Sequence, residues 1–238
     1  MSQHFFTLIF RLTTASLLLA LLGACSTWLP PPTPPPHFYA LTSAQTTAPP
    51  AAATTATAAT TLIISPPQAA AGFNSRRIIY VRQPYQLEYY AHSEWVDTPA
   101  RMLAPMIVSA VENTAAFGAV ILSPSSATAD LGLHVEIIRL QHEVGRQPGQ
   151  ARFTLRAYFV ANATRQIIAT REFEQTVTAD SETPYGGVTA ANLAVRGVLR
   201  ELAIFCQETS EKWSKFPVDR KAEKIPGENS GSKTGGTK

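Results

Sequence analysis

The chain has 238 residues, of which 16% are charged, and its formal net charge is +3. So small an excess of positive charge excludes the basic surface that nucleic-acid binding requires, so we expect no nucleic-acid partner. The length suits one folded domain accompanied by unfolded segments.

The first segment has the features of a secretory signal peptide. Residues 1–24 contain no acidic residue, and Arg11 precedes an apolar run from Leu12 to Leu22. A helix over this run would span about 16 Å, half of a hydrocarbon core of roughly 30 Å, so it is too short to cross a membrane. We therefore predict a signal peptide over residues 1–24.

The end of this segment, Leu22-Gly23-Ala24-Cys25, resembles a bacterial lipobox. The resemblance implies lipid attachment at Cys25, with acyl chains on its thiol and, after cleavage, on its amino group. An ordinary cleavage site and a disulfide are the alternatives, but the other cysteine, Cys206, lies in an apolar helical pattern. Three acyl chains would anchor the protein permanently. By resemblance to enterobacterial sorting rules, Ser26 points to the outer membrane and its periplasmic face.

Three segments of biased composition surround or interrupt the expected domain. Residues 25–37 hold the lipidated cysteine and six prolines, which favour an extended polyproline II spacer, with a proline-rich ligand as the alternative. Residues 44–61 contain only Ala, Thr, Pro and Gln and predict a flexible insertion. Residues 213–238, rich in Lys, Glu, Gly and Ser, predict a disordered tail. The folded domain is then expected over residues 38–212.

Alternating and β-branched patterns predict eight strands within this domain. They are His37–Thr42, Leu62–Ser65, Arg77–Arg82, Gln86–His92, Ala119–Leu122, Leu131–His142, Ala151–Asn162 and Gln166–Thr178. In the seventh, Phe153 and Leu155 face one way and Arg152 and Arg156 the other. Depending on the length of the following loop, these arginines share the solvated face with Glu172 and Glu174 and can pair with them.

Two helices complete the predicted domain. The first is expected from Pro99 to Gly118, capped by Asp97 or Thr98, with a kink or a late start at Pro105 because an interior proline costs about 3 kcal/mol. The second is expected from about Gly187 to Gln207. The fold class is therefore predicted to be α+β, a mostly antiparallel sheet with two helices packed on one face.

Residues suited to catalysis or metal binding do not form a recognisable set. His134 and His142 would lie about 27 Å apart on one strand and cannot share a metal. His134 and Glu136 could form an acid–base pair, but solvated strand residues explain both. The pair Gly186–Gly187 could cradle a phosphate at a helix start, yet a turn explains it more simply. We expect no enzyme activity, no cofactor and no metal.

Several segments follow one another in a distinctive order, separated by the first predicted helix. They are FYAL at residues 38–41, RRIIYVRQPYQLEYYAHSEWVDTPARML at 76–103, FGAVI at 117–121 and ADLGLHVEIIRLQHE at 129–143. This order resembles the ABC-type transport auxiliary lipoproteins, which include the lipoprotein of the paraquat-inducible operon and partners of Mce-type lipid transporters. The insertion at residues 44–61 is longer than this family leads us to expect.

The resemblance implies an outer-membrane-anchored periplasmic lipoprotein that serves an Mce-type ABC transport system for lipids or other apolar solutes by tethering and docking. Its implied partners are an Mce-type periplasmic protein, an ABC permease and ATPase complex, and the membrane through the lipid anchor. Two alternatives stay open: a periplasmic shuttle that binds lipid in an apolar cavity between sheet and helices, and a structural lipoprotein of envelope assembly. Homo-oligomerisation also stays open.

An aromatic cluster precedes the first predicted helix and is formed by Tyr80, Tyr89, Tyr90 and Trp95. Core packing is one interpretation of these rings, and a patch that binds a partner is the other. On the second interpretation, Tyr89, Tyr90 and Trp95 are the candidate partner-binding residues.

Overall fold

The computed structural model describes residues 34–42, 60–145 and 147–215, with a few isolated positions near the N-terminus. The predictions for Cys25, for most of the insertion and for residues 216–238 lie outside these described residues. Thr61, the last residue of the expected insertion, is the first residue of a strand. The elements below lie in the compact unit that begins at Pro36. None of the helices in the described part of the chain is long and apolar enough to span a membrane.

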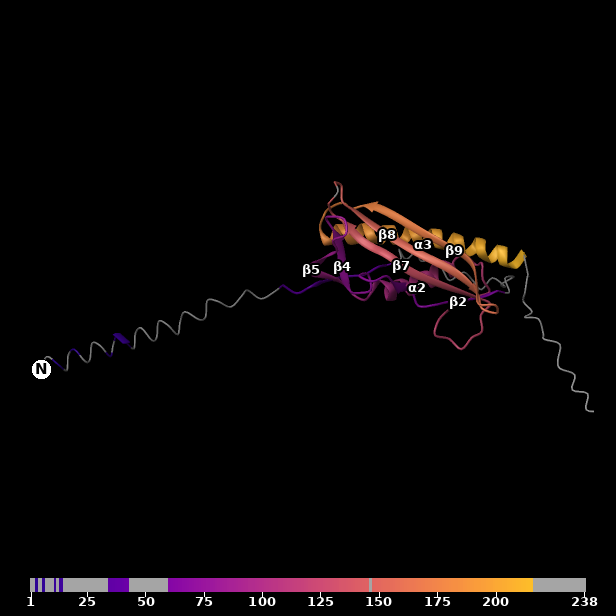
Figure 1. Ribbon diagram of the computed structural model, residues 1–238, viewed down its shortest axis with the longest axis horizontal. Helices are drawn as coiled ribbons and strands as arrows, with labels where there is room; N and C mark the ends of the chain where they lie inside the picture. Colours follow the sequence, from indigo (N-terminus) through magenta and orange to yellow (C-terminus); the bar gives the residue numbers. More distant parts are fainter. Residues whose placement is uncertain are drawn as a thin grey trace, which may run out of the picture. The chain divides into compact units, whose positions relative to one another are not determined.

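Three long strands form an antiparallel meander, drawn in pink to orange in Figure 1. They are β7 (Leu131–Glu143), β8 (Gln150–Ala161) and β9 (Gln166–Thr178). Leu155 of β8 lies between Ile137 and Phe173 in the register, and all three side chains are buried. Alternation of apolar and polar residues, interrupted by one register shift in each pairing, sets this register, because a slip of one residue would turn the apolar side chains towards water.

The other edge of β7 pairs in succession with three short strands, and all three run parallel to it. They are β2 (Thr61–Ile64), β3 (Gln68–Ala69) and β4 (Arg77–Val81). Beyond β2 lies β6 (Ala119–Leu122), while β4 is followed by β5 (Glu88–Trp95) and then by β1 (His37–Tyr39).

The expectation of a mostly antiparallel sheet is therefore wrong. Only β4–β5, β7–β8 and β8–β9 pair antiparallel among the described strands, and the other five pairings are parallel. The chain runs in the same direction through β2, β3 and β4 and lays each piece along a further stretch of β7. The fold class is α+β with a mixed sheet of nine strands.

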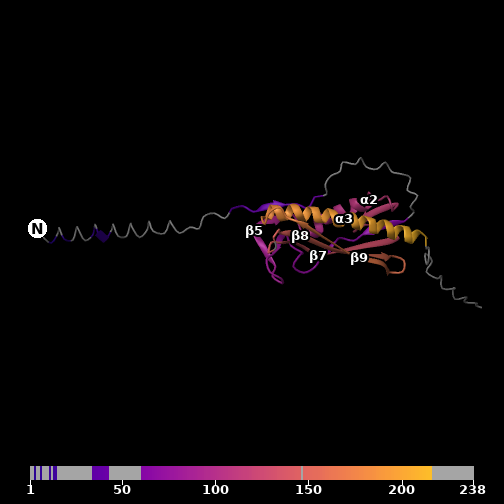
Figure 2. The same cartoon turned by 90° about the horizontal axis from the view of Figure 1, so that it is seen from above.

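Two helices lie on the same side of β7, β8 and β9, as Figure 2 shows. They are α2 (Pro99–Glu112) and α3 (Pro184–Lys215), and they contact each other. Helix α2 begins at Pro99 after the N-cap residue Thr98 and contains Pro105. Of the two alternatives expected at Pro105, a kink or a late start, the late start is therefore wrong. Helix α3 starts before Gly187 and runs past the domain boundary expected at residue 212.

The core lies between this helical layer and the sheet. Its fully buried side chains come from both helices and from the long strands, among them Leu103, Ile107, Val195, Val198, Leu202, Leu133, Ile137, Phe153 and Phe159. Burying one such side chain stabilises the fold by about 1.5 to 3 kcal/mol. Beside His142, where α3 begins, the remaining void measures about 10 Å³, about enough for one water molecule.

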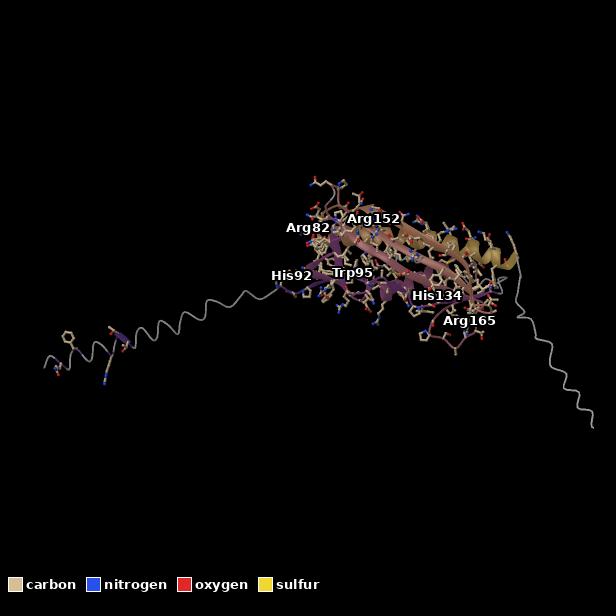
Figure 3. All side chains as sticks on the ribbon, viewed as in Figure 1. Arg82, His92, Trp95, His134, Arg152 and Arg165 are labelled. Carbon is tan, nitrogen blue, oxygen red and sulfur yellow. The ribbon has the colours of Figure 1, made fainter. Side chains whose placement is uncertain are left out.

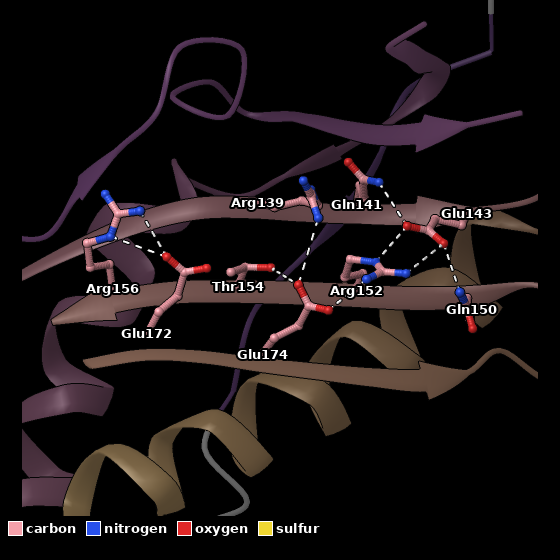
Figure 4. A network of polar contacts seen from close by, with 9 residues as sticks. All are labelled: Arg139, Gln141, Glu143, Gln150, Arg152, Thr154, Arg156, Glu172 and Glu174. Atoms are coloured by element: carbon pink, nitrogen blue, oxygen red, sulfur yellow. Dashed lines mark hydrogen bonds and ion pairs between the residues drawn. The ribbon is translucent and has the colours of Figure 1, made fainter. Parts of the chain in front are cut away.

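The opposite face of the long strands is polar and carries a network of ion pairs, shown in Figure 4. Arg152 binds Glu143 at 2.8 Å and Glu174 at 2.6 Å, and Arg156 binds Glu172 at 2.9 Å. The predicted pairing of these two arginines with Glu172 and Glu174 is confirmed. Among the described elements no helix covers this face, and the exposure of its ionic side chains ranges from 13% for Glu143 to 49% for Glu172.

Candidate functional site: an arginine–aromatic surface and an adjoining cleft

Arginine and aromatic side chains gather at the end of the sheet formed by β1, β5 and β4. Three guanidinium groups lie over ring faces, with distances to the ring centroid of 5.4 Å for Arg76 over Phe38, 4.9 Å for Arg77 over Tyr89 and 5.1 Å for Arg82 over Tyr80. Phe38, Tyr89 and the nearby Tyr85 are exposed. We call these seven residues, Phe38, Arg76, Arg77, Tyr80, Arg82, Tyr85 and Tyr89, the arginine–aromatic surface.

Strand β4 places the arginines because its apolar centre, Ile78 and Ile79, is buried and its ends are not. The main chain at Arg76 is held by Trp95, whose amide donates to the Arg76 carbonyl at 2.7 Å. The ion pairs of these arginines are long: the distance is 3.8 Å from Arg76 to Glu94 and 3.9 Å from Arg82 to Glu88. Exposed cation–π contacts contribute about 0.5 to 1 kcal/mol each. The charged groups therefore stay accessible to a partner.

Only one of the three candidate partner-binding residues is exposed. Trp95 is 3% exposed and belongs to the core, so its expected role in binding a partner is wrong, and core packing is the right interpretation. Tyr90 is half-buried, with its ring 4.5 Å from the Tyr80 ring and its hydroxyl 2.8 Å from His142 Nδ1. Tyr90 therefore supports the surface from below, and Tyr89 presents its ring to solvent.

His142 is a buried support for this end of the sheet. The residue is 2% exposed, and its Nε2 has no hydrogen-bond partner among the described residues. Burial lowers the pKa of His142, with Glu182 acting weakly in the opposite direction. Burial also raises the pKa of Tyr90. The imidazole is therefore neutral at physiological pH and accepts or donates one hydrogen bond, with Tyr90.

The Gly186–Gly187 pair is explained by packing. A Cβ at Gly187 would collide with the ring of His142, and one at Gly186 would collide with Ser181. The protein itself therefore fills the space around the first turn of α3. The alternative of a phosphate cradle at this helix start has no support in the structure.

A cleft of about 590 Å³ adjoins the arginine–aromatic surface on the helix-free face. Its rim is largely apolar and is formed by Phe73, Pro84, Tyr85 and Leu87. Its floor is polar and comprises Arg139, Gln141, Glu143 and Arg152. These residues come from β7, β8 and two separate loops, so no local sequence pattern predicts the cleft.

Hydrogen bonds fix the charge state of the floor. Burial alone would raise the pKa of Glu143, but hydrogen bonds from Arg152, Gln150 and Gln141 outweigh it and hold that pKa below its usual value. The hydrogen bond to Glu143 in turn raises the pKa of Arg152. The floor therefore carries fixed ionic groups at neutral pH.

Elsewhere the described residues show no second candidate site for chemistry. His134, which lies at the opposite end of the domain from Arg82 and Trp95 in Figure 3, stacks on Tyr158 at 4.9 Å. Within the described residues no group of three or more His, Cys, Asp or Glu side chains could hold a metal. Burial raises the pKa of Cys206 to about 12, so this thiol is protonated and unreactive.

Comparisons with known proteins agree with this architecture. The family model described as ABC-type transport auxiliary lipoprotein component matches residues 39–203. A crystal structure of a Xanthomonas campestris protein of the DUF330 family is similar with a TM-score of 0.62 and 23% identity, covering 66% of this chain and 89% of that one. An uncharacterised protein is similar with a TM-score of 0.56 and 10% identity, covering 72% and 99%. At these identities the similarity shows the fold alone. A comparison with curated proteins finds no match.

Proposed function

Because the chain belongs to the ABC-type transport auxiliary lipoprotein component family, we propose that it is an outer-membrane-anchored periplasmic lipoprotein serving an Mce-type ABC system that moves lipids or other apolar solutes. Its role is tethering and docking. Acylated Cys25 fixes one end of the chain in the membrane, the proline-rich spacer sets the reach, and the domain docks the periplasmic part of the transporter. The matched family is described as a transport auxiliary lipoprotein component, and the proposed role includes no enzyme activity.

The proposed tether joins the domain at its first strand, and several contacts hold this strand in place. Strand β1 pairs with β5 along its whole length, and Leu41 just after it is buried. The amide of Thr42 donates to Asn192 Oδ1 at 2.8 Å, and Asn192 Nδ2 donates to the Ala40 carbonyl at 3.2 Å. The point where the spacer enters the domain is therefore tied both to the sheet and to α3.

The arginine–aromatic surface is the observation that supports docking most directly. Tyr and Arg are enriched at protein interfaces, because a ring buries a large area and a guanidinium offers several donors. Here the stacks hold these side chains in place before a partner arrives, which lowers the entropy cost of binding. An aromatic anchor of this kind costs above 2 kcal/mol when truncated, which corresponds to an about thirtyfold loss of affinity.

Capture from cells after mild cross-linking tests the proposal. Wild-type protein is expected to co-purify with an Mce-type periplasmic subunit, and Tyr89→Ala should weaken capture about thirtyfold. Its melting temperature should fall by no more than about 4 °C, because it loses one exposed cation–π contact. Ile167→Ala is the matched control, since Ile167 is exposed on β9 outside the surface. Trp95→Ala should instead lower stability by about 3 to 5 kcal/mol.

Palmitate labelling tests the lipid anchor. The wild-type protein should incorporate labelled palmitate, and Cys25→Ser should not.

Two results would contradict the proposal. Wild-type protein that captures no Mce or ABC component would remove the transport role and leave the structural lipoprotein of envelope assembly. Full capture by the folded Tyr89→Ala variant would show that docking uses another face of the domain.

A further inference from the structure

We propose that the cleft on the helix-free face binds an anionic amphiphile. Its hydrocarbon chain lies against the apolar rim, and its phosphate or carboxylate lies between Arg82 and Arg139. The ligand would bind the domain itself, so its binding can be measured without the transporter partner.

The size and place of the cleft suit such a ligand. A volume of about 590 Å³ falls within the range of about 300 to 1,000 Å³ found for small-molecule sites. The void between α3 and the sheet beside His142 is only about 10 Å³. A pocket between α3 and β9 measures about 230 Å³, which is below that range. The cleft on the polar face of the sheet is therefore the better match to such a ligand.

The rim is apolar and held in place by the backbone. Tyr85 and Leu87 are exposed, so hydrocarbon laid over them would remove apolar surface from water. Gly72, with φ +92°, lets Leu87 approach, because Leu87 Cδ1 would lie 3.2 Å from a Cβ at that position. Tyr85 has φ +69°, a left-handed conformation that is uncommon for a tyrosine and is concentrated at functional sites.

The loop that carries Arg82 is fixed from the other side of the cleft. A Cβ at Gly145 would collide with the Arg82 carbonyl oxygen, so only glycine permits this close approach. The amide of Val144 donates to the Val81 carbonyl at 3.0 Å. The opening between the rim and β7 is thus formed before a ligand enters.

The charges of the lining select the head group. Three arginines and one glutamate line the cleft. Arg152 is engaged by Glu143 and Glu174 at short range. Arg139 has an ion pair with Glu174 at 3.8 Å, and Arg82 has one with Glu88 at 3.9 Å. The Arg139 and Arg82 side chains are 39% and 61% exposed. Arg82 also donates to the Tyr80 hydroxyl at 3.2 Å. A guanidinium has five donors, so both groups keep donors for a phosphate or carboxylate, whose geometry they match.

Equilibrium dialysis tests this site with the full-length lipidated protein in phosphatidylcholine nanodiscs. The probes are radiolabelled octyl phosphate, octanoate, octyl glucoside and inorganic phosphate, and protein-free nanodiscs supply the background. Octyl phosphate is expected to bind saturably at one site per protein molecule. Its affinity should be at least tenfold higher than that of inorganic phosphate, which lacks the hydrocarbon chain, and than that of octyl glucoside, which lacks the charge. Equal binding of octanoate would support a general oxyanion site, and weaker binding a phosphate-selective one.

Variants separate the two halves of the site. Arg139→Gln should lower the affinity for octyl phosphate at least tenfold, whereas Arg156→Gln, on the same face but outside the cleft, should leave it unchanged. Leu87→Gln should weaken the binding of octyl phosphate and octyl glucoside alike. Melting temperatures show that each variant is folded. Binding no greater than that of empty nanodiscs, equal binding of octyl glucoside and octyl phosphate, or full affinity in folded Arg139→Gln would overturn the proposal.

Discussion

At the scale of single residues, the arginine–aromatic surface depends on a stack of side chains beneath it. Tyr80 packs on Tyr90, Tyr90 hydrogen-bonds to His142, and His142 lies against Gly187 of α3. Each member is positioned by the next, so a change at the bottom of the stack should reach the surface. Two predictions follow from the packing and from the charge of His142.

The first prediction concerns the contact between His142 and α3. Gly187→Ala should destabilise the domain by about 1 to 3 kcal/mol, because the added methyl group overlaps the imidazole and forces α3 or the ring to move. Urea unfolding followed by circular dichroism measures the effect.

Gly197→Ala is the matched control within the same helix. Its Cβ would lie 3.0 Å from the flexible side chain of Gln175, and alanine favours a helix interior by about 1 kcal/mol. This variant should be neutral or slightly stabilised. Equal stability of the two variants would show that α3 is not packed closely on His142.

The second prediction concerns pH. Burial lowers the pKa of His142 in the folded protein, so below its unfolded pKa of about 6.5 the unfolded chain binds more protons than the folded one. Stability should therefore fall as the pH drops from about 7 towards the lowered folded pKa. The pKa of Glu143 is held below its usual value in the folded protein, so protonation of this carboxylate lowers the stability only in more acidic solution.

His142→Gln removes the titrating group and leaves an acceptor for Tyr90. Its melting temperature should fall less than that of the wild type between pH 7.5 and 5.5. A slope that is unchanged by this substitution would contradict the assignment of a neutral, buried imidazole.

At the scale of elements, β7 organises the sheet: it pairs with β8 on one edge and with three short strands on the other. The ion pairs on its polar face differ greatly in burial. The Glu143 and Arg152 side chains are 13% and 21% exposed, whereas Arg156 and Glu172 are about half exposed. Their contributions to stability should differ accordingly.

This difference gives a third prediction. Arg152→Gln should destabilise the domain by about 1 to 3 kcal/mol, because it removes the 2.8 Å charge-assisted hydrogen bond from Arg152 to the largely buried Glu143 carboxylate. Arg156→Gln should cost about 0 to 1 kcal/mol, as exposed pairs do. Parallel urea titrations compare them, and equal losses would mean that burial does not set the strength of this network.

The elements differ in how well the sequence predicted them. The strand Gln166–Thr178 matches β9 at both ends, the prediction for β7 differs by one residue at its C-terminal end, and the prediction for β8 is shifted by one residue at both ends. Long alternation marks a half-buried strand clearly. Strand β3 has two residues and no pattern. The parallel pairing of β2, β3 and β4 was also missed, since short apolar runs carry no information on which edge they join.

At the scale of the whole domain, the arginine–aromatic surface and the cleft share Arg82 and Tyr85, and β1 enters the sheet at the same end. The sequence predicted the aromatic cluster and so located Tyr89. It did not separate exposed Tyr89 from buried Trp95, because both lie on β5 and burial depends on what the helices cover. The cleft was missed because its residues are distant in the chain.

Site-specific photo-cross-linking in cells tests the docking of a transporter through this end of the domain most directly. A benzophenone amino acid replaces Tyr85 on the arginine–aromatic surface or, as the control, Ile204 on the exposed side of α3. The account predicts a cross-linked product with an Mce-type periplasmic protein from position 85 and none from position 204. A product with that protein from position 204 alone, or from neither position while both variants are folded and membrane-bound, would contradict it.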